Sequence, residues 1–181
     1  DCTTYGIRML PVDINESYYE FVEEDGNIRF GFKGIKGLGE ANKDLCDKIS
    51  ERDGGIYKSV NDFLKRLSYI DEEGKKVVLP GKKLLEPLVN SGAFDVFGYN
   101  RKILLETLES YRIDVSGADN KKEYANQMID RLEIQELPKD VAYNMAQEMK
   151  YMGKVLSENP LADYGSDESY GCIPIDSMKK G

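Results

Sequence analysis

Residues 28–49 read IRFGFKGIKGLGEANKDLCDKI. The first part of this stretch is typical of a β-strand, and the second part places Ala41, Leu45 and Ile49 at four-residue spacing, which is typical of one face of a helix. Gly37-Leu38-Gly39 lies where the two patterns meet. Because glycine permits backbone conformations that a side chain forbids, the junction predicts a tight turn that leads into the helix.

A Gly-apolar-Gly turn that precedes an amphipathic helix is typical of a helix-hairpin-helix motif. Such a turn directs backbone N–H groups and the N-terminus of the next helix at a phosphate oxygen. We expect Leu38 to point inward and anchor the turn, and Lys33 and Lys36 to flank the same phosphate. A contact of this kind reads no bases, so it predicts binding that is independent of DNA sequence and weakened by salt.

A tight turn inside a packed domain explains the same glycines, and the sequence leaves this alternative open. Glu40 favours the alternative, because a carboxylate at a helix N-terminus competes with phosphate for the positive end of the helix dipole. The net charge of the 181 residues is −8, which repels polyanions as a whole. Residues 75–112, however, carry seven basic and four acidic side chains, net +3, so any contact with nucleic acid must be local.

Cysteine and histidine usage excludes the common zinc sites. The three cysteines, Cys2, Cys46 and Cys172, lie far apart, and the chain has no histidine. We expect Cys46 to be a buried structural thiol and Asp13 to have a turn or capping role, with no metal ligand at either position. No nucleophile elbow, Walker lysine loop or G-x-G-x-x-G motif is present, so we expect neither catalysis nor a cofactor in this stretch.

The two ends of the chain and its hydropathy indicate where it acts. No apolar run approaches the roughly 20 residues of a membrane span, and residues 1–10 lack the pattern of a signal peptide. We therefore expect a reduced, cytoplasmic chain without membrane contact. The first residue is Asp1 and no initiator Met precedes it, which suggests a piece of a longer protein; processing or tag removal would look the same.

The periodicity along the chain predicts a mainly α fold with a small N-terminal β element. We expect the β element over residues 1–32, a tandem helix-hairpin-helix region over 33–112, a helical extension over 113–162 and a linker over 163–181. Ser59 and Asn100 are predicted to cap helices. Pro87 conflicts with a regular helix interior. The two helices of the extension are predicted to bury the faces Tyr124, Met128 and Leu132, and Val141, Met145, Met149, Met152 and Leu156.

Five stretches in the same order resemble the alpha subunit of bacterial DNA polymerase III. They are GIRMLPVDIN, IRFGFKGIKGLGE, GGIYKSVNDFLKRL, KKLLEPLVNSGAFDVFGYNRKILLETLE and QEMKYMGKVLSENPL. The resemblance covers residues 6–162. In that family this region follows the catalytic palm and spans the end of the fingers and the tandem helix-hairpin-helix region that holds duplex DNA. It implies that residues 1–32 belong to the end of the fingers and that the partners are primer-template DNA and the remainder of the polymerase chain.

The resemblance also implies site residues. Gly37, Leu38, Gly39 and Ala41 match the first hairpin turn and the start of its second helix, and residues 92–95 match a later, degenerate turn. Phe94 of that turn is expected to be a core anchor. Arg101 and the neighbouring lysines are expected to be solvated, and their clustering in the basic segment predicts at least one phosphate contact. The candidate DNA-binding residues are Lys33, Lys36, Gly37, Leu38, Gly39, Lys82, Lys83, Gly92, Asn100, Arg101 and Lys102.

Two family features are not matched by these residues. The family's polymerase chemistry uses palm carboxylates that hold Mg ions, and the resemblance does not extend to that domain. Many members also carry a sliding-clamp peptide in which glutamine is followed by leucine and then phenylalanine or a similar pair; Gln127, Gln135 and Gln147 lack that continuation. A clamp contact is therefore possible but has no recognisable motif. The acidity after Ile113 suggests that this half packs on protein or faces solvent.

Three hypotheses remain open from the sequence. The chain is a sequence-independent duplex-binding module of a replicative polymerase, or an architectural segment without DNA affinity of its own, or an adaptor to another partner. The net charge of −8 favours the second. We expect no catalysis by this stretch alone under any of the three.

Overall fold

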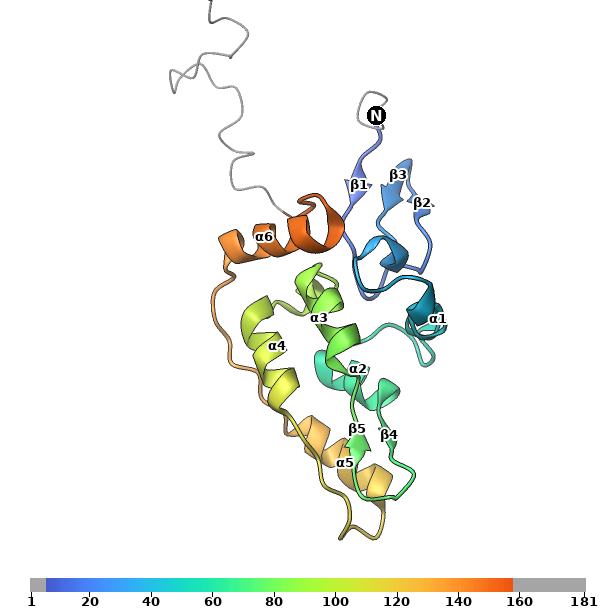
Figure 1. Cartoon of the computed structure of the whole chain (residues 1–181), viewed down its shortest axis with the longest axis vertical. Coiled ribbons are helices and arrows are strands. Elements are labelled where there is room, and N and C mark those ends of the chain that lie inside the picture. Colours follow the sequence, from blue (N-terminus) through green and yellow to red (C-terminus); the bar gives the residue numbers. More distant parts are fainter. Residues whose placement is uncertain (1–5, 158–181) are drawn as a thin grey trace, which may run out of the picture.

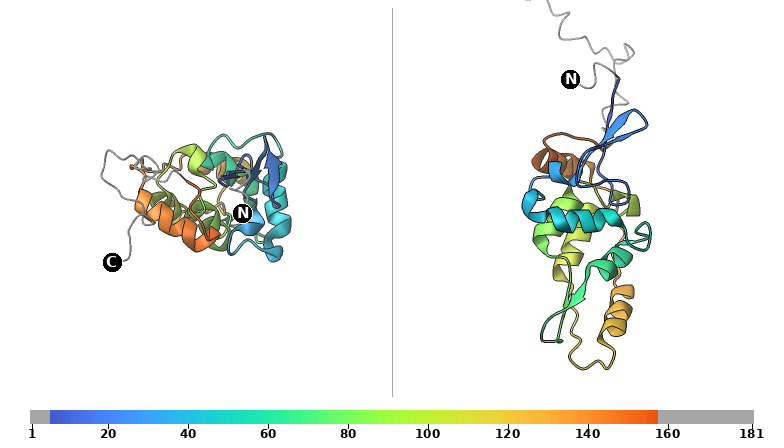
Figure 2. Two further views of the ribbon diagram at one scale, coloured as in Figure 1. Left: turned by 90° about the horizontal axis from the view of Figure 1, so that it is seen from above. Right: turned by 90° about the vertical axis from the view of Figure 1, so that its right-hand side faces the viewer.

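The computed structural model describes residues 6–157, so the linker expected over 163–181 lies outside the described residues. The molecule is elongated, with a small sheet at one end and helix α5 at the other (Figures 1 and 2). The order of elements confirms the expected fold class, mainly α with a small N-terminal β element. None of the helices in the described part of the chain combines the length and apolarity that crossing a membrane requires.

The N-terminal sheet contains β1 (Met9–Leu10), β2 (Val22–Glu24) and β3 (Asn27–Arg29) in the order β1-β3-β2. Strand β3 pairs parallel with β1 and antiparallel with β2. The turn from β2 to β3 has two residues, Asp25 and Gly26, with φ of +50° and +77°. An Asp-Gly pair with two positive φ angles matches the twist of a hairpin, which explains why this turn was predictable from sequence.

Six α-helices lie within residues 6–157 and form most of the body. They are α1 (Lys43–Glu51), α2 (Val60–Leu67), α3 (Lys82–Asn90), α4 (Arg101–Ser110), α5 (Lys121–Asp130) and α6 (Val141–Met152). Short 3₁₀ turns precede α1 and α4; they are η2 (Phe32–Gly34), η3 (Glu40–Asn42) and η4 (Asp95–Phe97). The expected caps are present, because the side chains of Ser59 and Asn100 accept hydrogen bonds from first-turn N–H groups of α2 and α4.

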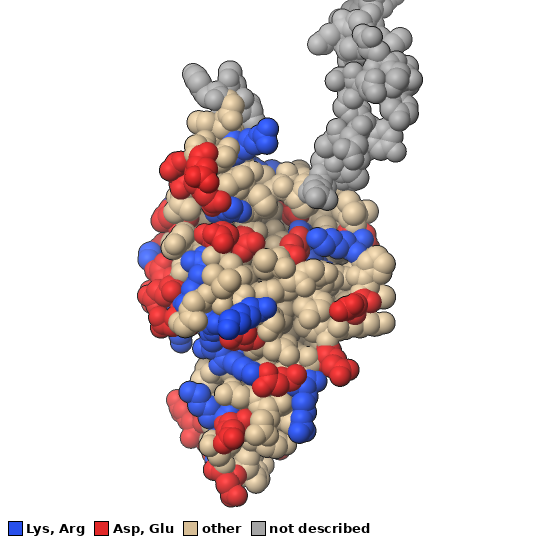
Figure 3. All heavy atoms as spheres, turned by 180° about the vertical axis from the view of Figure 1, so that it is seen from behind, with Lys and Arg blue, Asp and Glu red and all other residues tan. Residues whose placement is uncertain are grey.

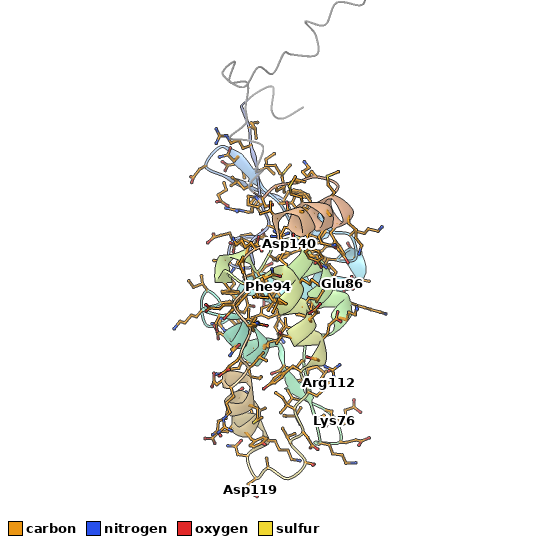
Figure 4. All side chains as sticks on the ribbon, turned by 90° about the vertical axis from the view of Figure 1, so that its left-hand side faces the viewer. Lys76, Glu86, Phe94, Arg112, Asp119 and Asp140 are labelled. Atoms are coloured by element: carbon orange, nitrogen blue, oxygen red, sulfur yellow. The ribbon has the colours of Figure 1, made fainter. Side chains whose placement is uncertain are left out.

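A second sheet, which the sequence analysis did not predict, connects α2 to α3. It pairs β4 (Tyr69–Ile70) with β5 (Val77–Val78) in antiparallel register. The chain after α4 extends this edge, since Val115 N donates to the carbonyl of Lys75 at 2.8 Å. Figure 4 shows Lys76 and Arg112 toward this end of the molecule and Asp119 at its tip. Each strand has only two residues, too few for an alternating pattern to be recognised.

One continuous core holds the helices together, and aromatic rings form its centre. Phe63 of α2 lies edge-on to Tyr57 and to Phe94, with ring centroids 5.2 Å and 4.9 Å apart. Phe94 is buried, as expected, and Figure 4 shows it in the middle of the body. Cys46 is also buried, and burial raises the pKa of its thiol to about 11, consistent with a structural role. Asp13 accepts a hydrogen bond from Asn15 N at 2.7 Å, which confirms its turn role.

The predicted inward faces of the last two helices were partly right: Leu132 and Met152 are buried, and Met128 and Leu156 pack against the core, but other predicted positions are exposed. Helix α5 buries Ala125 and Ile129, whereas Tyr124 is exposed. Helix α6 buries Asn144, Glu148, Tyr151 and Met152, whereas Val141 and Met149 are 43% and 55% exposed. In α6 the carboxylate of Glu148 turns inward to accept a hydrogen bond from the buried Arg101, so the helix exposes Val141 and Met149.

Candidate nucleic-acid interface

The first hairpin turn needs its glycine for two independent reasons. Gly37 has φ of +100°, a region that side chains rarely adopt. Its Cα also faces Pro87 of α3, since a Cβ placed on it would lie 3.3 Å from the proline Cγ. Leu38 is fully buried, as expected for the anchor of the turn. The turn is therefore fixed against α3 while the backbone of both glycines remains exposed.

Several N–H groups of this turn have no hydrogen-bond acceptor among the described residues. The N–H of Lys36 donates to the carbonyl of Tyr151 in α6 at 2.8 Å. By contrast, the N–H groups of Gly37, Gly39 and Glu40 donate to no group within residues 6–157, and all three residues are exposed. Exposed N–H groups gathered at a turn before a helix form an anion-binding concavity.

Glu40 lies in the same turn and carries the charge that opposes an anion there. Its carboxylate accepts a hydrogen bond from the hydroxyl of Tyr19 at 3.3 Å. Burial, and then the charge of Glu40, raise the pKa of that hydroxyl, so Tyr19 stays a donor at neutral pH. Lys43 lies 5.2 Å from the centre of the Tyr19 ring and adds a positive charge nearby.

The candidate lysines differ in how far carboxylates already neutralise them. Lys33 pairs with Glu20, and Lys82 lies 3.1 Å from a carboxylate oxygen of Glu109. Lys36, Lys83 and Lys102 are exposed, and none of them forms an ion pair among the described residues.

The structure divides these lysines between two surfaces. Lys83 precedes Pro87 by four residues in α3 and therefore lies on the helix face that meets Gly37. Lys82 and Lys102 line a different groove, between α3 and α4, together with the carboxylates Glu86, Glu106 and Glu109. Among the candidate lysines, Lys36 lies in the open turn and Lys83 lies on the α3 face that meets it, and neither forms an ion pair among the described residues.

The second turn is closed and covered, unlike the first. The N–H groups of Gly92 and Ala93 donate within the turn, to the carbonyls of Val89 and Leu88 at 3.1 and 3.0 Å. Residues 91–94 are buried. The N-terminal segment covers them, because Ile14 N donates to the carbonyl of Ala93 at 2.8 Å. No comparable set of exposed N–H groups is available here for a phosphate.

Arg101 belongs to the interior, which corrects the expectation that it is a solvated side chain. It is 2% exposed, and its guanidinium forms a two-point ion pair with Asp95, at 2.9 and 2.6 Å. It also donates to Glu148 of α6 at 2.7 Å and to the carbonyl of Asn90 at 3.1 Å. Burial favours the neutral form, but the hydrogen bonds and charges of Asp95 and Glu148 outweigh it and raise the pKa of Arg101.

Gly92 and Asn100 likewise have internal roles. Gly92 leaves the space in which the Arg101 guanidinium lies, and the side chain of Asn100 caps α4 and donates to the carbonyl of Pro138 at 2.6 Å. Their polar groups are used within the fold. We therefore leave Gly92, Asn100 and Arg101 out of the proposed interface.

Glu148 is the residue of this region that sequence reasoning missed. It is 1% exposed, and its second oxygen accepts from the N–H groups of Leu156 and Ser157 at 2.7 and 2.9 Å. Burial alone would raise the pKa of Glu148, but these donors and Arg101 lower it below its ordinary value of 4.5. Arg101 lies 47 residues away in sequence, so no local pattern indicated the pair.

Charges of both signs are interspersed over the face shown in Figure 3. The described residues contain no group of three or more His, Cys, Asp or Glu side chains arranged to hold a metal ion. The face in view therefore has local cationic positions and no extended basic patch.

Comparisons with known proteins agree with this architecture. Residues 6–104 match the helix-hairpin-helix motif family. The chain is 36% identical over 173 residues to the DNA polymerase III subunit alpha of Borreliella burgdorferi, covering 88% of this chain and 14% of that protein. It is 40% identical over 118 residues to the subunit of Deinococcus radiodurans, covering 65% of this chain and 8% of that protein.

A third relative covers still more of the chain. The DNA polymerase III subunit alpha of Neisseria meningitidis serogroup A is 32% identical over 178 residues, or 92% of this chain. The chain spans between 8% and 14% of the length of these three curated relatives. It belongs to the helix-hairpin-helix family and is homologous to one segment of the alpha subunit of bacterial DNA polymerase III.

Proposed function

We propose that this chain is a duplex-binding segment of a bacterial replicative DNA polymerase, which grips the phosphate backbone of primer-template DNA during replication. The first hairpin is the contact. The N–H groups of Gly37, Gly39 and Glu40 receive one phosphate, and Lys36 and Lys83 lie beside it. Lys82 and Lys102 line the separate groove between α3 and α4, and Lys33 and Lys82 are already paired with carboxylates.

The observation that carries this proposal is the difference between the two turns. The first exposes unused N–H groups next to free lysines, whereas the second uses its N–H groups internally and is buried. N–H groups and lysines contact phosphate and read no bases, so binding is independent of sequence and weakened by salt. The relatives' names, DNA polymerase III subunit alpha, fit a role on DNA.

The remaining parts of the proposal follow from the same role. Nucleotide transfer and its metal ions belong to other parts of such a polymerase, and we propose neither a cofactor nor a sliding-clamp contact for this stretch. Its partners are the DNA and the rest of the polymerase chain. A replicative role implies a cytoplasmic location with the chromosome.

A purely architectural role is the second candidate. The net charge of −8 and the interspersed surface charges favour it, because both oppose autonomous binding to a polyanion. The buried second turn is also a packing element in both candidates. The two differ in whether the isolated chain has affinity for DNA.

Titration of the chain into fluorescent primer-template duplex and matched single strand, first at low salt and then at rising salt, separates the two candidates. The DNA-binding proposal predicts that log affinity for duplex falls linearly with log salt, with a slope worth about two to four phosphates. Two duplexes of unrelated sequence should bind equally. Absence of duplex binding at low salt, with the chain folded, would favour the architectural role.

A further inference from the structure

Helix α6 contacts both hairpin regions. At its C-terminal end, the carbonyl of Tyr151 accepts the N–H of Lys36 at 2.8 Å, directly before the first turn. One turn earlier, Glu148 accepts from Arg101 at 2.7 Å, beside the second turn. Figure 1 shows the C-terminal end of α6 next to the segment that leads from the sheet to α1, and Figure 2, seen from above, agrees.

Polar contacts of Glu148 and Tyr151 help to hold α6 in place, beside the apolar contacts of its buried C-terminal turn. Its buried side chains are Asn144, Glu148, Tyr151 and Met152. Both oxygens of Glu148 accept hydrogen bonds, whereas Asn144 Oδ1 has no partner within residues 6–157. Tyr151 adds a further polar link, because its hydroxyl donates to Glu86 of α3 at 2.6 Å. Because Glu148 is a buried charge, loss of one of its hydrogen-bond partners destabilises the position of α6 more than loss of an exposed contact would.

Glu148 makes the central polar contact of α6, and both of its carboxylate oxygens accept hydrogen bonds. One faces Arg101, and the other accepts the two N–H groups that follow α6, from Leu156 and Ser157. Glutamine has the same shape but only one acceptor oxygen. If that oxygen accepts Leu156 and Ser157, its NH₂ group faces the Arg101 guanidinium, donor against donor.

We propose that Glu148 is a positioning residue for DNA binding: it seats α6, and α6 through the Tyr151 carbonyl holds the Lys36–Gly37 backbone in its open form. The DNA readout of this inference rests on the proposed function, but the structural coupling does not. The coupling joins a buried carboxylate to a turn 112 positions earlier in sequence, through two contacts on one helix.

Amide hydrogen exchange of the unmodified chain tests the coupling without any variant. The amides of Lys36, Leu156 and Ser157 all depend on α6, so they should exchange through one opening with the same denaturant dependence. The amide of Ser68, which donates to Leu64 in α2, serves as the reference and should open less often. If Lys36 stays as protected as Ser68 while Leu156 and Ser157 open, the hairpin does not depend on α6 and the proposal fails.

Glu148→Gln tests the consequence for DNA, with Glu133→Gln as the matched control. Glu133 is exposed and forms no ion pair among the described residues, and both variants remove one negative charge. Electrostatics alone predicts slightly tighter DNA binding for each. The proposal predicts the opposite for Glu148→Gln: Lys36 exchange about tenfold faster and duplex affinity several-fold weaker, with α2 still protected.

The outcomes separate this proposal from the proposed function. Equal DNA affinity and unchanged Lys36 exchange in the two variants would overturn the positioning role. A wild-type chain that binds no DNA would overturn the proposed function, and Lys36 exchange would still decide the coupling. If Glu148→Gln does not fold, the exchange pattern of the unmodified chain decides it.

Discussion

The guanidinium of Arg101 lies against the bare Cα of Gly92, so close that a Cβ placed on Gly92 would be 2.5 Å from Nη2. Gly92 also has φ of +92°. The glycine of the second turn thus makes room for a buried cation, whereas Gly37 of the first turn leaves its backbone exposed to solvent. The two turns thus differ in structure: the glycine of the second is buried against a cation, and the glycine of the first is exposed.

Gly92→Ala should therefore destabilise the protein more than conformational strain alone explains. A non-glycine residue at this φ costs about 1–3 kcal/mol, and displacing a guanidinium held by ion pairs adds to that cost. Gly98→Ala is the matched control, because Gly98 has φ of +79° and its Cβ would meet no atom within 4 Å. Urea denaturation should give a clearly lower free energy of unfolding for Gly92→Ala. If both variants lost the same free energy of unfolding, the close contact between Gly92 and Arg101 would be contradicted.

Arg101→Met should lower stability and leave the salt dependence of DNA binding unchanged. Removing the arginine leaves the carboxylate of Glu148 buried without its cation, which typically costs about 3–5 kcal/mol. The midpoint temperature of thermal unfolding, Tm, should then fall by about 2–4 °C for each kcal/mol of stability lost in a chain of this size. A smaller salt slope at unchanged stability would instead identify Arg101 as a phosphate ligand.

Local signals explain the parts of the fold that were predictable. The Asp25-Gly26 turn and the Ser59 and Asn100 caps each depend on residues within a few positions of one another. The positive φ of Gly37 also has a local signature, although the position of that turn depends on the distant Pro87 and Tyr151. Glycine at positive φ and oxygen side chains at helix N-termini have direct sequence signatures.

The orientation of α6 around Glu148 and the burial of Arg101 were not predictable, because they depend on distant partners, although Leu132 and Met152 are buried as expected. In α6 the apolar positions Val141 and Met149 suggested a core face, yet the helix turns Glu148 inward toward an arginine 47 residues away. The spacing of apolar residues usually shows which face of a helix is buried. In α6 the need to pair the buried Arg101 with a carboxylate determines the orientation instead. For the interface, sequence indicated the first turn, but only the structure separated Lys83 from Lys82.

Acid should destabilise the native chain partly through Glu148. Because its pKa in the folded state lies below 4.5, the native state binds fewer protons than the unfolded state near that pH. The contribution of Glu148 to the free energy of unfolding is fully present above about pH 4.5 and is lost as pH falls through the lowered pKa. The stability difference between wild type and Glu148→Gln, from urea denaturation, should be constant near neutral pH and shrink below about pH 4.5. A difference that stays constant down to pH 3 would exclude a lowered Glu148 pKa.

Two adjacent lysines give the sharpest test of the interface, since Lys82→Glu and Lys83→Glu change the net charge by the same amount. Lys83 shares the α3 face of Pro87 beside the open turn, whereas Lys82 lies near Glu109 and Glu86, at 3.1 and 4.0 Å. Lys83→Glu should weaken duplex binding uniformly across sequences and reduce the salt slope by about 1, because one phosphate contact is lost. Lys82→Glu should leave the slope nearly unchanged and cost some stability through repulsion with the neighbouring carboxylates.

The same comparison holds at the turn itself, between Lys36→Glu and Lys33→Glu. Lys36 has no ion pair among the described residues, and its backbone N–H bond to Tyr151 does not involve the side chain, so Lys36→Glu should weaken binding at unchanged stability. Lys33 is already paired with Glu20 and should contribute less. If all four variants weaken binding equally, only net charge matters, and the chain binds DNA through its general field and not through this turn.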